Sequence, residues 1–563
     1  MAQDLRIKRV IFRASGGSDG EPLNIETPNV TVLVGPNNSG KSLSLREIEA
    51  LCQGNSDKCL LIKKIDLVLP QSFDELMAML ARHIADPPEN HRARPDFFWL
   101  ARPAIRQGEE RIYEEVHHDG LRDAYVRGDS QDIRHAFVRA FTLRLDGRTR
   151  FDLVDPKETG PLEQYPQNHL WALFKDDANR QKVQDFTQAA FGKYFVVDPT
   201  GMRYFRARLS DRKPKSGAEE QALDARARTF HQKAPLVAEL GDGVRCSVGL
   251  VSAIMSLDQR ILLIDEPEAF LHPTLSRHVG RVLAQAARDR DATLITATHS
   301  SDFLFGCIQA APDLRIVRLT YDGGRATART IDSAQILRLM NDPLLRSTSA
   351  LRALFYRGVV VTEADPDRAL YDEINHRLLL EKEGIEDGIF INAQNWQTIP
   401  RLVAPLREIG IPAAAIFDFD VLMSNQFSHL WPLAYESEQV LQQLQADREK
   451  VRRLMAVVSK TACKDNGINA FEERDREFVK AFVDRMAQYG LFFVIVGELE
   501  CWLSHLGVRK RRNKPTWLTD VFEKLGSDPS DNGYVRPLGG DVWDFVRQIE
   551  HWIGDQDRRG MPA

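Results

Sequence analysis

Disulfide pairs, long apolar runs and a strong net charge are all missing from this chain of 563 residues. The six cysteines are scattered without a C-x-x-C pair or a metal-ligand spacing, which argues against structural disulfides and fits a reducing cytoplasm. No run approaches the roughly 20 apolar residues that span a membrane, and the stretch MAQDLRIKRVIFRAS lacks the apolar core of a signal peptide. The net charge of −5 does not single out a nucleic-acid binder, so any basic surface must be local. We therefore expect a cytoplasmic protein without a membrane partner.

The composition is that of a globular protein with more than one domain. Apolar residues make up 43% of the chain and charged residues 28%, which argues against disorder. The chain is too long for a single compact core, so two or three domains are expected. Apolar strands followed by helices recur around the motifs described below, which predicts an α/β fold.

A glycine-rich turn follows a β-branched strand in VTVLVGPNNSGKS. The turn has the GxxxxGK[ST] pattern in its required context of strand, loop and helix, which argues against a chance glycine turn. Its glycines let backbone N–H groups surround phosphate oxygens, while Lys41 would reach the β- and γ-phosphates and Ser42 would ligate Mg²⁺. The sequence therefore predicts ATP and Mg²⁺ as cofactors, held by Gly35, Pro36, Asn37, Asn38, Ser39, Gly40, Lys41 and Ser42.

Carboxylates that complete such a site follow another apolar strand, in RILLIDEPEAFLHP. Asp265 would hold the magnesium ion with Ser42, and Glu266 would polarise the attacking water. A further strand, in ATLITATHS, leads to His299. A lone histidine at such a position is usually structural, but after these two motifs in this order we predict that His299 senses the γ-phosphate.

The stretches GPNNSGKS, LLIDEPEAFLHP and TATHS together resemble the ABC-type ATPase head shared by SMC, RecF and OLD-family proteins. In that superfamily a signature loop of one head closes on ATP held by another. Its place here is taken by LGDGVRCSVGLVSAI, in which Gly241 and Gly243 would keep the backbone contact to the nucleotide that the resemblance implies, while the serine of the usual loop is missing. The resemblance implies homodimers or higher even homo-oligomers.

A long segment separates Lys41 from Asp265, far more than one crossover requires. Within it we predict a helix in DELMAMLARHI, a hairpin turning at 198–201 and one helix in AEEQALDARARTFHQ. Residues 70–175 give mixed signals, and the OLD resemblance implies an inserted helical subdomain there that holds a dimer together. The whole ATPase domain is expected to span 1–345.

The second half of the chain places acidic residues after two apolar strands, in RGVVVTEADPDRALYDEI and PAAAIFDFDVL. The strands belong to a β-α-β-α-β order, and ligand sites of open α/β sheets lie at the carboxyl ends of strands. Asp418 and Asp420 would point together as alternate residues of a strand and could meet Glu363 on a neighbouring strand. Two interpretations stay open. The acids are solvated strand ends and an acidic helix start, or they bind divalent cations that remove the repulsion of clustered carboxylates.

A glutamate after one strand and Asp-x-Asp after a later one resemble the TOPRIM domain, with Ala364 where that domain usually has glycine. Behind an ABC-type head, such a domain resembles the OLD family of ATP-regulated nucleases, whose third acidic site matches GELE in LFFVIVGELE. The resemblance implies a Rossmann-like α/β TOPRIM nuclease domain over 346–563, with Asp365 at a variable position. It implies a catalytic role for Glu363, and binding of Mg²⁺ or Mn²⁺ by Glu363, Asp367, Asp418, Asp420, Glu498 and Glu500.

The densest basic cluster of the chain lies in VRKRRNKPTWL and comprises Arg509, Lys510, Arg511, Arg512 and Lys514. Such a run is usually solvated surface, but nucleic-acid phosphates must approach a nuclease strand at this place. The OLD family carries a lysine followed by proline that steadies the transition-state phosphate. Lys514-Pro515 matches that pair, and Lys524 is a second candidate.

These patterns predict an ATP-hydrolysing, metal-dependent endonuclease that nicks or cleaves DNA, in defence against phage or foreign DNA or in DNA repair. A separate defence-system partner protein is compatible with that role. Two alternatives stay open. One is a RecF-like DNA-binding ATPase without nuclease activity, and the other is a defence ATPase whose TOPRIM effector cleaves RNA such as tRNA.

Overall fold

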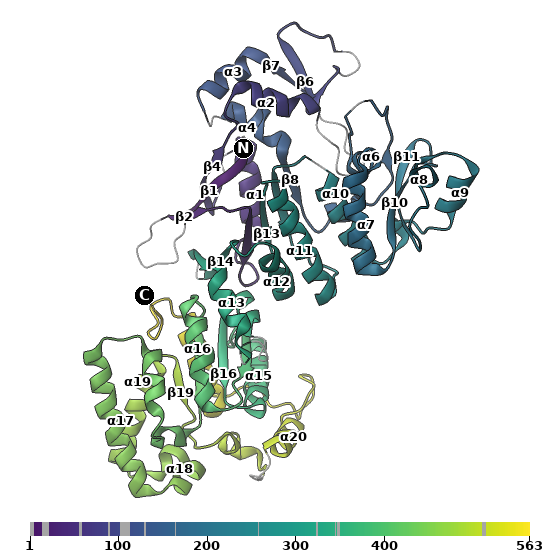
Figure 1. Ribbon diagram of the computed structural model, residues 1–563. Helices are drawn as coiled ribbons and strands as arrows, with labels where there is room; N and C mark the ends of the chain where they lie inside the picture. Colours follow the sequence, from purple (N-terminus) through teal and green to yellow (C-terminus); the bar gives the residue numbers. More distant parts are fainter. Residues whose placement is uncertain are drawn as a thin grey trace. The chain divides into compact units, whose positions relative to one another are not determined.

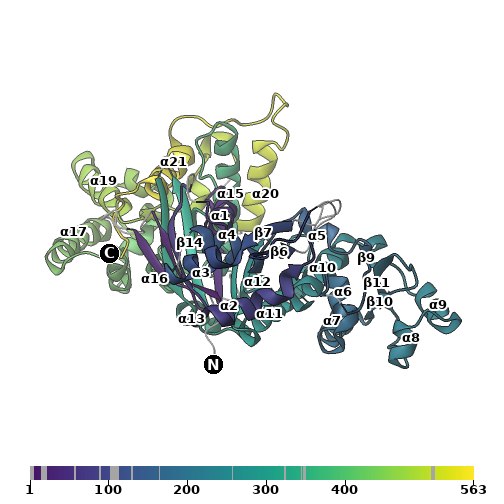
Figure 2. The same cartoon turned by 90° about the horizontal axis from the view of Figure 1, so that it is seen from above.

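The computed structural model contains two compact units, both drawn in Figure 1 and Figure 2. The first comprises Met1–Val34 and Asn38–Ala334, and the second comprises Gln335–Ala563 together with Gly35–Asn37. The two units therefore divide after Ala334, somewhat before the domain boundary at residue 345 that the sequence predicts. The structure describes residues 5–13, 22–55, 59–87, 91–101, 113–128, 131–163, 165–256, 258–322, 325–343, 345, 350–508 and 514–562.

A six-stranded sheet forms the centre of the first unit, in the order β15-β14-β3-β13-β12-β8. The strands from β14 to β8 pair in parallel, and β15 pairs antiparallel to β14. Every residue of β3 and β13 is buried, as expected for a parallel sheet with both faces covered. The strands are β3 (Val30–Val34), β8 (Thr142–Leu145), β12 (Ile261–Asp265), β13 (Thr293–Ala297), β14 (Arg315–Asp322) and β15 (Arg325–Asp332).

Helices from distant parts of the sequence accompany this sheet (Figure 1). The apolar side of α1, with Leu45 and Ile48, belongs to one core with Leu33, Leu263 and Ile295 of the sheet. That packing places the start of α1 beside the carboxyl ends of β3 and β12. The helices are α1 (Lys41–Cys52), α10 (Asp242–Ser256), α11 (Pro273–Asp289) and α12 (Ser301–Ala310).

Three smaller antiparallel sheets lie among the described residues of the first unit, in the orders β2-β1-β4, β5-β6-β7 and β10-β11-β9. The β10–β11 pairing confirms the hairpin predicted at 198–201. The strands are β1 (Arg6–Phe12), β2 (Leu23–Glu26), β4 (Ile62–Val68), β5 (Ile84–Ala85), β6 (Phe97–Ala101), β7 (Tyr113–His117), β9 (Lys157–Glu158), β10 (Tyr194–Asp198) and β11 (Tyr204–Ser210).

Two expectations for the segment between the nucleotide motifs are wrong. Residues 70–175 are mixed rather than helical, because they include the β5-β6-β7 sheet and also β8, which pairs with β12 in the central sheet. The stretch AEEQALDARARTFHQ forms two helices, because the Asp224 side chain accepts the Ala227 N–H and so caps a new one. The helices are α2 (Phe73–Leu80), α3 (His118–Val126), α4 (Gln131–Ala136), α5 (Thr149–Asp152), α6 (His169–Lys175), α7 (Asp177–Phe191), α8 (Gly217–Gln221) and α9 (Ala225–Gln232).

A four-stranded parallel sheet in the order β17-β16-β18-β19 forms the centre of the second unit. β16 and β18 are buried throughout, and the predicted β-α-β-α-β order is present as β16, α15, β17, α16 and β18. The last two strands are shorter than the apolar stretches that predict them. The strands are β16 (Gly358–Thr362), β17 (Gly388–Asn392), β18 (Ala413–Phe417) and β19 (Leu491–Phe493).

Helices α15 and α20 of the second unit lie side by side in both views (Figure 1 and Figure 2). Buried Arg377 of α15 joins them by donating to the carbonyl oxygens of Leu525 (3.0 Å) and Val535 (2.9 Å). Within the described part of the chain, no helix is long and apolar enough to cross a membrane. The remaining helices are α13 (Ser333–Asn341), α15 (Asp365–Leu380), α16 (Ile399–Glu408), α17 (Glu438–Val458), α18 (Lys460–Asn466), α19 (Glu473–Ala487), α20 (Lys514–Leu525) and α21 (Asp541–Gly554).

Candidate nucleotide site and acidic strand edge

The glycine-rich loop connects β3 directly to α1. Gly35 and Gly40 have φ angles of 142° and 91°, and Asn38 has 58°, so the loop turns through backbone conformations that favour glycine. Lys41 is the first residue of α1, is 5% exposed, and places its Nζ 3.3 Å from Ser39 Oγ. The N-terminus of α1 therefore has a glycine-rich loop before it and the buried ammonium group of Lys41 beside it. Such an arrangement is suited to bind phosphate.

Asp265 ends β12 and lies beside this loop. The Ser42 hydroxyl donates a hydrogen bond to its carboxylate, and burial raises the pKa of that carboxyl group. Asp265 Oδ1 is buried and has no hydrogen-bond partner among the described residues. A buried carboxylate oxygen without a partner, next to a hydroxyl, is the kind of ligand set that Mg²⁺ takes together with phosphate oxygens.

Glu266 follows in a backbone conformation that is uncommon for residues other than glycine, with φ 47°. His299 Nε2 lies 3.8 Å from its Oε1. Two residues that sequence reasoning missed fix this segment. Buried Arg150 of α5 donates to the Glu266 carbonyl oxygen at 2.6 Å, and Glu268 accepts the His299 N–H at 2.7 Å. Glu268 stands inside the DEPEAF stretch and could have been found there, whereas Arg150 has no local signal.

Gly241 and Gly243 lie at the start of α10, where the sequence places the signature loop. A Cβ atom on Gly243 would lie 2.8 Å from the carbonyl oxygen of Phe270, whereas one on Gly241 would meet nothing within 4 Å. Glycine at 243 therefore permits a close backbone approach between α10 and the loop that follows β12. The predicted signature segment is thus packed against the predicted catalytic segment of the same chain.

The acidic residues of the second unit follow the carboxyl ends of its parallel strands, which lie at one edge of the sheet. Two loops of this edge are joined, because the Phe419 N–H donates to the Gly497 carbonyl oxygen at 3.1 Å. The predicted residues lie after β16 and in the first turn of α15 (Glu363 and Asp367), after β18 (Asp418 and Asp420), and after β19 (Glu498 and Glu500). We call this set the acidic edge.

Lys514, the first residue of α20, lies among these acids. Its Nζ is 3.3 Å from Asp367 Oδ1 and 3.6 Å from Asp418 Oδ2. Asp367 Oδ2 accepts the Ala364 N–H at 3.0 Å, so the turn forms with alanine at the position where glycine is usual. Glu500 Oε2 is buried and has no hydrogen-bond partner in the described part of the chain.

A second lysine, which the sequence analysis did not identify, forms ion pairs with other carboxylates of the acidic edge. Lys464 of α18 places its Nζ 2.7 Å from Glu498 Oε1 and 3.4 Å from Asp420 Oδ2. Asp418 and Asp420 therefore pair with different lysines. The expectation that they point together as strand residues is wrong, because β18 ends at Phe417 and Asp420 lies in a 3₁₀ helix over Phe419–Met423.

Burial governs the protonation of the acidic edge. It raises the pKa of Asp418 to about 7, with Asp367, Glu363 and Asp420 adding to the shift and Lys514 opposing it. Burial also raises the pKa of Glu363 and of Asp367. It lowers the pKa of the Lys514 ammonium, but the facing carboxylates outweigh burial and raise that pKa above its ordinary value. Burial of the charged form is therefore the main reason that these carboxyl groups hold their protons more tightly, and Lys514 opposes it.

The acidic edge offers the hard oxygen donors that divalent cations prefer. Among the residues described, however, no three His, Cys, Asp or Glu side chains come together as a metal site. Mg²⁺ keeps several waters and commonly takes only one or two carboxylates. The pairs Asp367–Asp418 and Asp420–Glu498 therefore suit such an ion in chemistry, but an ammonium now stands between the members of each pair.

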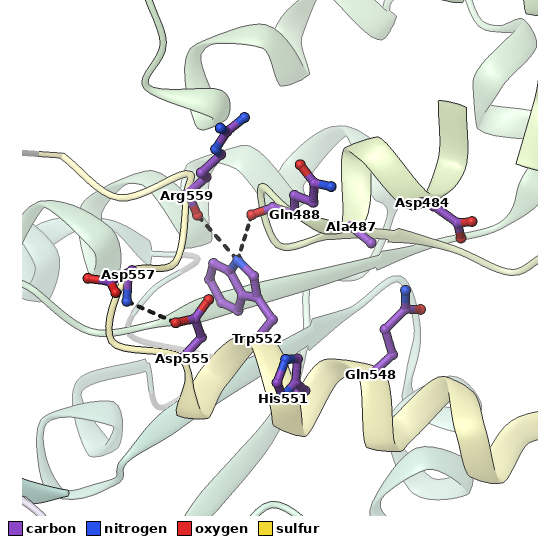
Figure 3. Close-up of a pocket in the computed structure, with 9 residues that line it drawn as sticks. All are labelled: Asp484, Ala487, Gln488, Gln548, His551, Trp552, Asp555, Asp557 and Arg559. Carbon is purple, nitrogen blue, oxygen red and sulfur yellow. Dashed lines mark hydrogen bonds between the residues drawn. The ribbon is translucent and has the colours of Figure 1, made fainter. Parts of the chain in front are cut away.

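The other predicted residues lie elsewhere. Asp365 accepts hydrogen bonds from Arg368 and Asn392, away from the lysines of the acidic edge. Lys524 is exposed in the last turn of α20, and the basic residues 509–512 lie outside the described residues. A cavity of about 470 Å³ in the second unit is formed partly by α19 and α21 (Figure 3). Its lining contains no member of the acidic edge, since it consists of Asp484, Ala487, Gln488, Gln548, His551, Trp552, Asp555, Asp557 and Arg559.

Known proteins share sequence with parts of this chain. The family described as "AAA domain, putative AbiEii toxin, Type IV TA system" matches residues 208–305. An OLD nuclease from Thermus scotoductus is 25% identical over 232 residues, which cover 39% of this chain and 42% of that protein. The phosphonates import ATP-binding protein PhnC 2 from Albidiferax ferrireducens is 34% identical over 86 residues, 15% of this chain and 31% of that protein. The chain thus aligns with less than half the length of these relatives.

Among solved structures, the SMC head domain from Thermotoga maritima is similar at 14% identity with a TM-score of 0.30, covering 58% of this chain and 99% of that chain. The family match and the strand–loop–helix geometry of the P-loop support a mixed α/β P-loop ATPase fold in the first unit.

Proposed function

We propose that the protein is an ATP-regulated nuclease that depends on a divalent metal ion. The observation that carries the proposal is the acidic edge: carboxylates from the ends of three parallel strands surround Lys514. Crowded carboxylates with raised pKa values and a nearby lysine suit metal-assisted cleavage of a phosphodiester. The partial identity to an OLD nuclease supports the same activity.

In the first unit, Lys41 would bind the β- and γ-phosphates of ATP, and Ser42 with Asp265 would hold Mg²⁺. Glu266 would orient the attacking water, with His299 beside it. Arg150 would keep the Glu266 carboxylate in place through the backbone of that residue. Gly241 and Gly243 would face nucleotide held by a second copy, which implies a homodimer or a higher even oligomer.

In the second unit, one or two carboxylates among Glu363, Asp367, Asp418 and Asp420 would hold the divalent ion together with water. When bound, such an ion supplies an activated water and stabilises charge on the phosphate. Lys514 would contact a non-bridging phosphate oxygen, because its Nζ already lies at the carboxylates that would hold the ion. The basic residues Arg509–Arg512 would bind neighbouring phosphates of DNA.

Two observations favour a second candidate, a RecF-like DNA-binding ATPase without nuclease activity. The lysines that separate the carboxylates, and the lack of a three-residue metal site among the described side chains, are compatible with a purely structural second unit. In that case a divalent ion would have no effect outside the nucleotide site.

Incubation of the purified protein with supercoiled plasmid and with total RNA tests the proposal. The reactions contain Mg²⁺ or Mn²⁺, with and without ATP, and EDTA serves as the control. We expect nicked or linear plasmid that depends on the metal. Intact DNA and RNA under all conditions would support the second candidate, and cleavage of RNA alone would identify an RNA-directed effector.

A further inference from the structure

Buried Arg150 joins the segment after β8 to the loop after β12. Its side chain is fully buried, and its Nη1 donates to the Glu266 carbonyl oxygen at 2.6 Å while its Nε donates to the Asp146 carbonyl oxygen at 3.2 Å. Its Nη2 is buried and has no hydrogen-bond partner among the described residues. Taking a charge out of water costs free energy, and an unused buried donor adds to that cost. Stability alone therefore does not explain an arginine at this position.

Glu266 is held in a backbone conformation that a glutamate seldom adopts. Its φ is 47°, and a left-handed conformation of this kind persists only where the surroundings fix it. The Glu266 N–H donates to the Ala297 carbonyl oxygen at 2.9 Å, which ties the residue to the end of β13. Its own carbonyl oxygen accepts from Arg150 and from the Ala269 N–H, at 2.6 Å and 3.0 Å. The backbone conformation sets the direction of the Glu266 side chain, so Arg150 contributes to that direction.

Ion pairs continue from this arginine to the helix that follows the phosphate loop. The Asp146 carboxylate accepts the Thr149 N–H at 3.1 Å, which fixes the turn before Arg150. Its other oxygen lies 3.1 Å from Arg144 Nη1, and Arg144 Nε donates to the carboxylate of Glu49 in α1. These side chains are 16% to 29% exposed, so salt screens their pairing less than that of fully exposed ions. We call Glu49, Arg144, Asp146 and Arg150 the ion-pair chain.

Packing against α10 fixes the backbone at the end of the ion-pair chain. A Cβ atom on Gly249 would lie 3.1 Å from the Arg150 carbonyl oxygen and 3.0 Å from Leu153 Cβ. Glycine therefore permits α10 to pack closely on α5, and closely packed interiors transmit strain instead of absorbing it. A small displacement of α1 would thus reach the loop after β12 through the ion-pair chain.

We propose that the ion-pair chain couples α1 to Glu266, and that Arg150 is the positioning residue that holds this glutamate in the conformation that hydrolyses ATP. The inference rests on the proposed function, in which Glu266 orients the attacking water. It goes further by identifying how nucleotide bound at the start of α1 is linked to the carboxylate that acts on it. Because Arg150 acts on Glu266 and not on the phosphates, its loss should slow turnover without weakening nucleotide binding.

A double-mutant cycle on ATP hydrolysis by the full-length protein tests the coupling. Arg150→Gln removes the last member of the ion-pair chain, Glu49→Gln neutralises the first, and a third variant combines them. Arg150→Lys keeps the buried charge and replaces Arg150→Gln if that variant does not fold. Because lysine lacks the fork of donors that reaches two carbonyl oxygens, the same loss is expected. Phosphate release gives kcat and KM, fluorescent-nucleotide binding gives the affinity, and circular dichroism melts confirm folding.

Two arginines of the same unit provide controls. Arg148→Gln changes an exposed arginine two positions from Arg150. Arg290→Gln removes another partly buried guanidinium that donates to main-chain carbonyl oxygens, those of Ile254 and Met255 in α10. The second control therefore reports what the loss of such an arginine does to activity through stability alone. Both controls should keep kcat within about two-fold of the wild type.

We expect Arg150→Gln to lower kcat about 10-fold to 100-fold, as for a misplaced catalytic group, with nucleotide affinity within about three-fold. Glu49→Gln should lower kcat about three-fold to ten-fold, and the double variant should match Arg150→Gln within about two-fold. Losses that multiply in the double variant, a wild-type kcat in Arg150→Gln or Arg150→Lys, or an equal loss in Arg290→Gln would each overturn the inference and leave the proposed function intact. A wild-type protein that does not hydrolyse ATP would contradict the proposed function itself, and the inference with it.

Discussion

The two acidic sites of this chain are built in opposite ways. Beside the P-loop, Asp265 has a hydroxyl for a neighbour and one buried oxygen without a partner among the described residues, while Lys41 lies next to Ser39. At the acidic edge, lysines stand between the carboxylates. The first site is arranged to receive a cation and phosphate together, whereas the second already contains positive charge.

This difference suggests different controls on the two reactions. In the proposed nucleotide site, the groups that would bind phosphate and those that would bind the metal are on separate residues, so ATP and Mg²⁺ would enter as one complex. At the acidic edge, an incoming metal ion must displace the ammonium group of a lysine, or bind where there are more carboxylates than ammonium groups. We therefore expect the nucleotide site to bind its metal through the nucleotide, and the acidic edge to bind its metal directly and weakly.

The largest expected effect concerns Glu266 at the first site. Glu266→Gln should lower ATP hydrolysis about 100-fold to 10,000-fold, because the water loses the carboxylate that polarises it. ATP affinity should change little, since Lys41, Ser42 and Asp265 remain. Phosphate release and fluorescent-nucleotide binding measure the two properties, with Lys41→Ala as the variant expected to lose binding. Hydrolysis at the wild-type rate would remove Glu266 from the mechanism.

At the second site, Lys514→Ala should lower cleavage about 100-fold, a loss typical of removing one group that stabilises transition-state charge. Substrate binding, measured by fluorescence anisotropy, should change less than about three-fold. Lys524→Ala is the matched control, because Lys524 is exposed on the same helix. If both variants lose activity equally, Lys514 has no particular role.

A smaller effect is expected at the packing between α10 and the loop after β12. Gly243→Ala should destabilise the protein by about 1–3 kcal/mol, because its Cβ would meet the Phe270 carbonyl oxygen at 2.8 Å. Gly241→Ala should stay within about 0.5 kcal/mol, since nothing lies within 4 Å of its Cβ. Urea melts compare the two, and equal stability would mean that the approach is not tight.

An effect of similar size is expected to depend on pH. Burial raises the pKa of Asp418 to about 7 from an ordinary value of 3.8, so the folded state binds more protons than the unfolded state in this window. Ionisation of Asp418 therefore costs stability as the pH rises from about 4 to 7. Asp418→Asn cannot ionise. In EDTA at pH 8 the variant should be more stable than the wild type by about 1–3 kcal/mol. This range is smaller than the pKa shift alone would give, because the substitution also removes the ion pair between Asp418 and Lys514.

That stability gain should disappear near pH 4, where Asp418 is protonated in the wild type as well. Asp365→Asn is the control, because its hydrogen bond to Arg368 lowers the pKa of Asp365 and so makes ionisation favourable in the folded state. Thermal melts at both pH values provide the comparison. A destabilised Asp418→Asn at pH 8 would show that the Lys514 pair outweighs burial.

Local patterns in the sequence predicted the elements that carry both sites. The P-loop turn and the acids after β12 and β16 follow from residues within one strand–turn–helix unit, so short-range chemistry determines them. Lys464 could not be found in this way, because α18 meets Glu498 only through tertiary packing at Gly467 and Gly497. Arg150 is similar, since its contact with Glu266 spans 116 positions.

The predicted elements were wrong where a strand or helix ends before the sequence pattern that predicts it. β18 stops at Phe417 although Phe419 continues an alternation of apolar and acidic residues, and the 3₁₀ helix that follows turns Asp420 toward Lys464. The Asp224 cap likewise divides a polar stretch into α8 and α9. In both cases the periodicity of apolar residues predicts which face of the element is buried. It does not predict where the element ends, because a side-chain cap or a tighter turn decides that.

Measuring both activities in one preparation of the Glu363→Gln variant tests the central claim most directly. Glu363 follows β16 at the acidic edge and contributes nothing to the nucleotide site. Plasmid cleavage in Mn²⁺ should fall below detection, while ATP hydrolysis stays within about two-fold of the wild type because the two sites use separate residues. Undiminished cleavage by Glu363→Gln would contradict the account and reduce the acidic edge to a structural strand end.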